Sequence, residues 1–201
     1  MTIESWITVW NEDPDNNWKG NVVNLQRAIE IAVEAHKGQL DKAGNLYVLH
    51  PLRVMMSLDT EDEKIVGVLH DVVEDCAPEG YQWERDGFSN FSKLAQGADV
   101  KKFTWEYLIK EGLSEELFEA LQSVSKTPNE EAAYRELKGD IKKAEQHYLA
   151  FIERAKANSI GRNVKAADIR DNLDISRIDV ITENDIKRLN RYKAALNLLG
   201  T

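Results

Sequence analysis

Apolar residues recur at three- and four-residue spacing along most of the chain, which is the pattern of amphipathic helices. The spacing predicts a first helix that begins near Val22 and ends before Gly38, with His36 on its inward side. A turn-rich stretch follows. Pro51 then suits the first position of a second, short helix.

Later segments carry the same periodicity together with clear start signals. Thr60 and Glu63 have the spacing of a capping box, in which the two side chains bond free N–H groups of the first helical turn. Thr182 with Asp185 starts a closing helix that ends at Gly200. Further helices are expected over 104–111, 114–125, 129–157 with a break near Gly139-Asp140, and 159–174.

The length of 201 residues fits one domain, and no strand alternation or internal repeat is present. We therefore predict an all-α, compact multi-helix bundle that spans 1–201. Residues 77–103 stand out, because proline and glycine punctuate them while Trp83, Phe88 and Phe91 are too apolar for a plain linker. We interpret this segment as an ordered insertion that forms either a small satellite core or a lid over the functional site.

Charge and composition narrow the classes of partner. Lys plus Arg number 26 against 35 Asp plus Glu, and the net charge of -9 repels nucleic-acid phosphates and anionic membranes. A small anionic substrate therefore needs a local basic patch. Cys76 is the only cysteine, which excludes an intrachain disulfide and favours a reducing compartment such as the cytoplasm. The sequence predicts no export signal and no transmembrane helix, and leaves homo-oligomer formation open.

The candidate chemistry centres on two of the four histidines. His50 precedes the short helix, and His70 is followed directly by Asp71 and then by Glu74 and Asp75. If one helix carries His70, Asp71, Glu74 and Asp75, these residues stand at positions i, i+1, i+4 and i+5. Three carboxylates and an imidazole then share one side of that helix. A divalent cation would compensate this crowding. Mixed imidazole and carboxylate ligands suit Mn, Fe or Zn better than Ca or Mg.

A further inward-facing polar group is expected near the end of the chain. In the string VKAADIRDNLD, Asp168 and Asn172 lie four residues apart on a predicted helix, so Asp168 can point inward. Together with His50 and the His70-Asp71 pair, this gives the order His, His-Asp, Asp that characterises the HD superfamily.

Four ordered strings resemble one branch of that superfamily, the hydrolase domain of the RelA/SpoT-type alarmone enzymes and their small stand-alone relatives. The strings are AHKGQ (35–39), GNLYVLHPLRV (44–54), VLHDVVED (68–75) and VKAADIRDNLD (164–174). The resemblance implies a helical fold, a single Mn²⁺, and removal of a pyrophosphate from the ribose 3′ position of a guanosine alarmone.

The resemblance also implies roles for individual residues. The implied metal ligands are His50, His70, Asp71 and Asp168. Glu74 and Asp75 match an acidic pair that positions or activates the attacking water, and Asn172 matches a position that contacts the nucleoside. Candidate cations for the substrate phosphates are Lys42, Arg53, Lys126, Arg154, Lys165 and Arg170.

Two features separate the chain from the larger alarmone hydrolases. Asp41 stands where those enzymes usually have a basic residue, so Lys42 is the candidate to replace it. The insertion at 77–103 follows Asp75 directly. Two alternatives stay open: an HD phosphohydrolase that acts on another nucleotide or a phosphodiester, and a nucleotide-binding regulator without catalytic activity.

Overall fold

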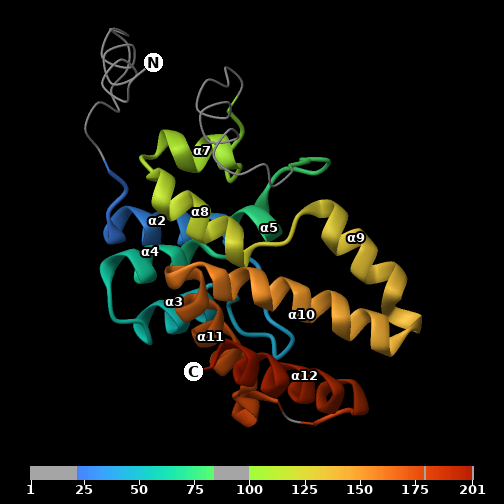
Figure 1. Ribbon diagram of the computed structural model, residues 1–201. Helices are drawn as coiled ribbons and strands as arrows, with labels where there is room; N and C mark the ends of the chain where they lie inside the picture. Colours follow the sequence, from blue (N-terminus) through green and yellow to red (C-terminus); the bar gives the residue numbers. More distant parts are fainter. Residues whose placement is uncertain (1–21, 84–99, 179, 201) are drawn as a thin grey trace, which may run out of the picture.

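The regular structure of the chain is helical (Figure 1). The computed structural model describes residues 22–83, 100–178 and 180–200. The α-helices are α2 (Leu25–Ala35), α3 (Leu49–Met56), α4 (Glu61–Leu69), α5 (Val72–Cys76), α7 (Trp105–Lys110), α8 (Glu115–Val124), α9 (Pro128–Glu136), α10 (Ile141–Ala157), α11 (Ser159–Leu173) and α12 (Glu183–Leu199). Within the described ranges, β-type backbone pairing consists of an isolated antiparallel bridge between Leu40 and Leu46. The prediction of an all-α fold is confirmed.

Local capping signals set most helix boundaries where the sequence predicts them. The Thr60 hydroxyl accepts from the backbone N–H of Glu63, and the Glu63 carboxylate accepts from the backbone of Thr60, which completes a capping box. Thr182 begins α12 in the same way. A short 3-10 turn, Leu137–Gly139, separates α9 from α10. No helix in the described ranges combines the length and apolar character needed to cross a bilayer.

The sequence prediction of one continuous helix through the His70-Asp71 pair is wrong. Helix α4 ends at Leu69 and α5 begins at Val72, so the pair occupies the junction. The His70 ring bonds the carbonyl of Gly67 at 2.8 Å, and the Ser125 hydroxyl donates to the carbonyl of His70 at 3.3 Å. Side chains thus engage carbonyls that a continuing helix would use, which favours a break here. Helix α3 also begins two residues earlier than predicted, at Leu49.

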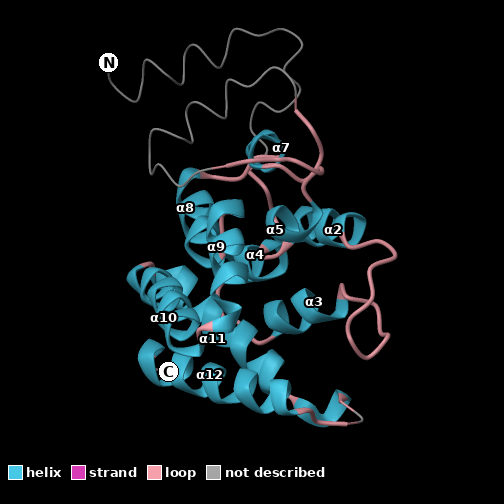
Figure 2. Cartoon of the chain, turned by 90° about the vertical axis from the view of Figure 1, so that its right-hand side faces the viewer, coloured by secondary structure: helices cyan, strands magenta, loops and turns pink. Residues whose placement is uncertain are grey.

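Helix α11 lies between two groups of buried side chains. Its Val164 and Ala167 belong to a large core built with α2, α3, α4 and α8. Its Ala166 and Ile169 belong to a smaller core shared with α10 and α12. Figure 2 shows α10, α11 and α12 grouped at one end of the molecule. A polar residue on α11, such as Asp168, is therefore buried from several sides.

The beginning of the predicted insertion is anchored to α7. The Tyr81 hydroxyl donates to Glu106 at 2.8 Å and accepts from the backbone of Trp105 at 3.2 Å. Trp83 packs edge-on against the ring of Trp105, with 5.0 Å between centroids, and belongs to the large core. Phe88 and Phe91 lie outside the described residues. The prediction that the insertion forms either a satellite core or a lid therefore stays a prediction, with both alternatives open.

The contact between α8 and α11 depends on a residue without a side chain. A Cβ atom on Gly161 would overlap the hydroxyl of Ser123 and lie 3.4 Å from the carbonyl oxygen of Ala155. We expect Gly161→Val to lower the free energy of unfolding by about 2 kcal/mol, because overfilling a packed contact costs about 1–3 kcal/mol. Urea denaturation would measure the change.

Gly139 supplies the matched control, because a Cβ there meets no atom within 4 Å. Gly139→Val should therefore change stability much less. Equal losses in the two variants would contradict a close approach of α8 and α11.

Candidate metal centre

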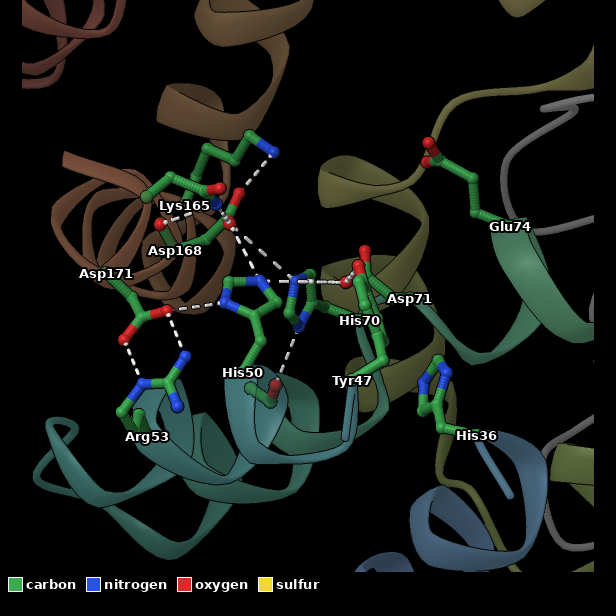
Figure 3. A network of polar contacts seen from close by, with 12 residues as sticks. His36, Tyr47, His50, Arg53, His70, Asp71, Glu74, Lys165, Asp168 and Asp171 are labelled. Atoms are coloured by element: carbon green, nitrogen blue, oxygen red, sulfur yellow. Dashed lines mark hydrogen bonds and ion pairs between the residues drawn. The ribbon is translucent and has the colours of Figure 1, made fainter. Parts of the chain in front are cut away.

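Side chains from three separate parts of the chain converge on one point (Figure 3). His50 lies on α3, His70 and Asp71 lie at the junction of α4 and α5, and Asp168 lies on α11. One ligand atom from each of His50, His70 and Asp71 lies within 4.8 Å of the other two. Oδ1 of Asp168 lies 3.3 Å from Nε2 of His50 and 3.8 Å from Nε2 of His70. The structure thus brings together all four sequence-predicted ligands.

Both imidazoles are oriented by a partner on the side away from this point. Nδ1 of His50 lies 2.7 Å from Oδ2 of Asp171, and Nδ1 of His70 lies 2.8 Å from the carbonyl oxygen of Gly67. Because both partners accept hydrogen bonds, each Nδ1 is assigned the proton and each Nε2 faces the cluster. His70 Nε2 is buried and has no hydrogen-bond partner among the described residues, although Oδ2 of Asp71 lies 3.0 Å away.

The two carboxylates are held by hydrogen-bond donors. The Tyr47 hydroxyl donates to Oδ2 of Asp71 at 2.7 Å. Lys165 donates to Oδ2 of Asp168, and the Asn172 amide donates to Oδ1 of the same residue, both at 2.7 Å. These contacts leave oxygens of both carboxylates close to the two imidazole Nε2 atoms.

Electrostatics ties the four groups together. Burial opposes ionisation of Asp71 and Asp168, but the positive charges of His70 and Lys165 respectively hold the pKa of each carboxyl well below its usual range. Burial lowers the pKa of His50, yet its hydrogen bonds to Asp168 and Asp171 outweigh this and raise the pKa to about 10. The two ionised carboxylates therefore favour a positive charge at the centre of the cluster. Two Nε2 atoms and two carboxylates are a donor set that fits a divalent transition metal.

Asp171 contacts the cluster and was not among the site residues predicted from the sequence. Its carboxylate accepts a hydrogen bond from Nδ1 of His50 and two from Arg53, whose Nε and Nη2 lie 2.6 and 3.0 Å from its two oxygens. Its spacing of three residues from Asp168 places both on one face of α11, which was the available signal. Which element that face meets depends on the packing of α3 against α11.

The acidic pair after the junction divides between two environments. Glu74 accepts from the backbone N–H of Lys126 at 2.8 Å and from its ammonium at 2.6 Å. Figure 3 shows Glu74 set apart from the four converging residues. Desolvation by the surrounding protein and the negative charges of Asp71 and Glu74 raise the pKa of Asp75 to about 7. The carboxyl of Asp75 is thus suited to exchanging a proton near neutral pH.

A cavity of about 760 Å³ opens beside the cluster. Its volume falls within the range that is usual for small-molecule sites. Its wall is formed by the 39–43 loop, α3, α5, α9, α10, α11, α12 and residues 174, 178 and 180. Four of the residues predicted to contact substrate line it, namely Lys42, Lys126, Lys165 and Asn172. The cationic lining is completed by Arg188 and Arg191, and the aromatic lining includes Tyr47, Tyr134, Tyr148, Phe151 and Tyr192.

Two predicted substrate-binding arginines are instead bound to the protein and lie outside the cavity lining. Arg53 binds Asp171, as described above. Arg154 binds the Glu130 carboxylate at 2.7 Å and the backbone carbonyl of Ser125 at 2.9 Å. Their positive charge identified them in the sequence, but their nearest acceptors are supplied by distant parts of the fold. We therefore interpret both as structural.

His36 agrees with its predicted core position. It is buried, its Nδ1 lies 2.7 Å from the Gln39 side chain, and its ring packs on Tyr47 at 5.0 Å between centroids. It therefore supports the ring that donates to Asp71. Burial raises the pKa of the neighbouring Cys76 thiol to about 12, which disfavours a reactive thiolate.

The contact of Asp171 with His50 generates a test. We expect Asp171→Asn to weaken Mn²⁺ binding by about 10–100-fold, because loss of a carboxylate behind a ligating histidine reduces its basicity and its orientation. Isothermal titration of the metal-free protein with Mn²⁺ would measure this. Asp174→Asn is the control, because Asp174 bonds the backbone of Ser176 at 3.0 Å on the same part of the chain. Equal affinities of the two variants would contradict the role of Asp171.

Comparison with known proteins gives a local match. No family model matches the chain. Over 83 residues the chain is 40% identical to "Putative GTP diphosphokinase RSH1, chloroplastic" of Arabidopsis thaliana. The aligned part covers 38% of this chain and 8% of that protein. The match supports a relation to RelA/SpoT-type enzymes over that part of the chain.

Proposed function

We propose that the chain is a metal-dependent phosphohydrolase that acts on a nucleotide, with Mn²⁺ as the metal and a 3′-pyrophosphate as the group removed. The observation that carries the proposal is the convergence of two imidazole Nε2 atoms and two carboxylates beside a cavity with a cationic and aromatic lining. The sequence resemblance and the local match to an enzyme named as a GTP diphosphokinase support a guanosine nucleotide as substrate.

The four converging residues would hold the ion. A bound divalent cation lowers the pKa of a coordinated water and polarises a phosphoryl oxygen. The protein contributes the fixed positions of His50, His70, Asp71 and Asp168, which are set by Asp171, Gly67, Tyr47 and Lys165 before any ligand arrives. Such preorganisation is what places a reacting group without a further entropic cost.

Asp75 is the proposed general base. A carboxyl with a pKa near 7 can accept a proton from the water that attacks the phosphorus. It can then release a proton to the ribose 3′ oxygen, which leaves as its bond to that phosphorus breaks and pyrophosphate is set free. The carboxylate of Glu74 is occupied by Lys126, so we assign it a positioning role. Within the predicted catalytic pair, we therefore assign proton transfer to Asp75 rather than to Glu74.

The cavity lining mixes acidic side chains with cations that an anionic substrate needs in a chain of net charge -9. Lys126 and Lys165 lie over the ring of Phe151, at 5.6 and 4.7 Å from its centroid. Both lysines also contact acids of the site, Glu74 and Asp168. They are therefore placed to receive phosphate oxygens next to the proposed metal.

A nucleotide panel tests the reaction. The Mn²⁺-loaded protein should release pyrophosphate from a 3′-pyrophosphorylated guanosine nucleotide, and chelation with EDTA or Asp71→Ala should reduce release to background, since both remove the proposed metal. Coupled detection of pyrophosphate would measure it. Release of phosphate from other nucleotides alone would favour the alternative HD phosphohydrolase. Nucleotide binding without turnover of any substrate would favour the regulator.

A second test separates the proton-transfer role from metal ligation. Asp75→Asn should lower kcat by about 10²–10⁴-fold, which is the usual contribution of a general base, while Mn²⁺ affinity stays close to that of the unmodified chain. Steady-state kinetics and metal titration measure the two quantities. Glu74→Gln is the neighbouring control and should lower kcat less. If Asp75→Asn weakens Mn²⁺ binding as strongly as Asp71→Ala does, Asp75 is a ligand and the assignment is wrong.

A further inference from the structure

An exposed apolar surface lies at the mouth of the cavity. The 39–47 loop and the start of α3 contribute three leucines to it, and the turn before α12 together with the first residues of that helix contributes three further aliphatic residues. We call these six residues the apolar rim, namely Leu40, Leu46, Leu49, Val180, Ile181 and Ile186. The exposed fraction ranges from 43% for Leu49 to 74% for Val180.

The three leucines of the rim form one local group. The antiparallel bridge pairs Leu40 with Leu46, so their side chains project from the same face of the loop. The backbone N–H of Leu49 bonds the carbonyl of Leu46 at 3.1 Å, which holds the start of α3 against that loop. Backbone contacts therefore bring the three leucines together.

The two halves of the rim lie on the same side of the molecule. Leu40 and Val180 both line the cavity. Hydrogen bonds from Thr182 and nearby charges, including that of Lys42, lower the pKa of Asp185, so the loop lies close to the start of α12. Figure 2 shows the loop before α3 and the turn before α12 on one side of the molecule. The rim is therefore one surface rather than six scattered side chains.

A gathered apolar surface has a different meaning from single exposed residues. Single aliphatic side chains on a protein surface are normal. A group of them that is bordered by charged residues is typical of an interaction surface, because a partner that covers the group removes its apolar area from water. Lys42 and Asp185 supply such a border here. The rim therefore favours a macromolecular partner.

The charge pattern favours a second copy of the chain as that partner. The whole chain carries 35 acidic residues against 26 basic ones, so two copies repel each other over most of their surfaces. The segments that carry the rim lack this excess, since residues 37–56 have three basic residues against one acidic, and residues 174–191 have four of each. Two copies can approach here without net repulsion, and exposed border residues such as Lys42 and Glu183 can pair across the contact.

We propose that the apolar rim is the contact surface of a two-fold symmetric dimer in which the second copy covers part of the cavity mouth. In such a dimer the same surface of both copies meets, so the aliphatic side chains of each chain are buried against an equally apolar surface. Leu40 and Val180 belong both to the rim and to the cavity lining, so the second copy completes the wall and limits the access of water. Dimer formation does not depend on the proposed function, whereas the effect on catalysis rests on it.

Sedimentation equilibrium of the full chain measures its mass in solution. The unmodified chain should have the mass of two chains at high concentration and should dissociate on dilution, because a two-chain equilibrium follows mass action. Added NaCl should not weaken the dimer, since apolar burial stabilises it and salt screens the repulsion that remains between two acidic chains.

Substitutions in the rim test whether this surface forms the contact. Leu46→Asp and Val180→Asp each place an uncompensated carboxylate in the contact, twice per dimer, and should raise the dissociation constant by at least about 100-fold. Val22→Asp is the matched control. Val22 is 69% exposed, and the residue after it bonds the carbonyl of Gly112 beyond α7, at the end of the molecule away from α12 (Figure 1). The control should change the constant by less than about twofold.

The fold of each variant is checked separately. All three positions are exposed, so the substitutions leave the buried core unchanged and each variant should fold. Thermal melting at a concentration where the unmodified chain is a monomer measures this. Leu46→Ser is a milder variant without a charge, and it should raise the dissociation constant by about tenfold, because it removes apolar area from both sides of the contact.

Three results would overturn the proposal. The first is the mass of one chain at every concentration, and the second is a dimer that survives both Leu46→Asp and Val180→Asp. The third is a mass that keeps rising with concentration, since a closed two-fold pair stops at two chains.

The kinetic arm uses the best nucleotide of the panel. The rate per chain should rise with protein concentration over the range in which the dimer forms, and should stay at the monomer value for Leu46→Asp. A rate per chain that does not change as the dimer forms would contradict the role of the second copy at the cavity mouth. If no nucleotide is hydrolysed while Leu46→Asp and Val180→Asp still dissociate the dimer, the proposed function fails and the dimer surface stands.

Discussion

The burial of Asp168 within α11 is the constraint on which the rest of the site depends. A carboxylate placed between two cores is tolerated only when its charge is compensated and its oxygens are bonded. Helix α11 itself supplies Lys165 three residues before Asp168 and Asn172 four residues after it, and both bond the carboxylate. The imidazole of His50 approaches from α3. The central helix of the fold and one wall of the candidate metal centre are therefore a single structure.

Each group at the centre is oriented by one neighbour outside it. Asp171 fixes His50, the Gly67 carbonyl fixes His70, and the Tyr47 hydroxyl fixes Asp71. Asp171 lies on α11, Gly67 lies on α4, and Tyr47 lies just before α3. Packing of α3 and α4 against α11 therefore aligns these partners with the groups that they orient. Without an ion, the positive charge between the carboxylates comes from protonated imidazole. A bound divalent cation would replace that charge, so the geometry serves both states.

The sequence predicts local features of this fold well and long-range features poorly. Capping at Thr60 and Thr182 depends on side chains three residues away, so both helix starts could be read directly. The break at His70 depends in part on Ser125, which lies 55 residues away. In the site, the motifs indicated the four residues that the structure brings together, whereas the contact of Asp171 with His50 arises only when α3 packs on α11. The pairing of Arg154 with Glu130 and Ser125 is a long-range feature of the same kind, since charge alone does not reveal the acceptor.

The acidic residues Glu74 and Asp75 illustrate how neighbours in sequence acquire different chemistry. Successive side chains on a helix point about 100° apart. The Glu74 side chain therefore reaches the α8–α9 connection, where the backbone N–H and the ammonium of Lys126 donate to it. The Asp75 side chain stays near Asp71, whose negative charge contributes to raising the pKa of Asp75 to about 7. Glu74 is held by Lys126 whereas Asp75 lies beside Asp71, so the two acids are not interchangeable. The direction of α5, set by the break at His70-Asp71, decides which acid takes which role.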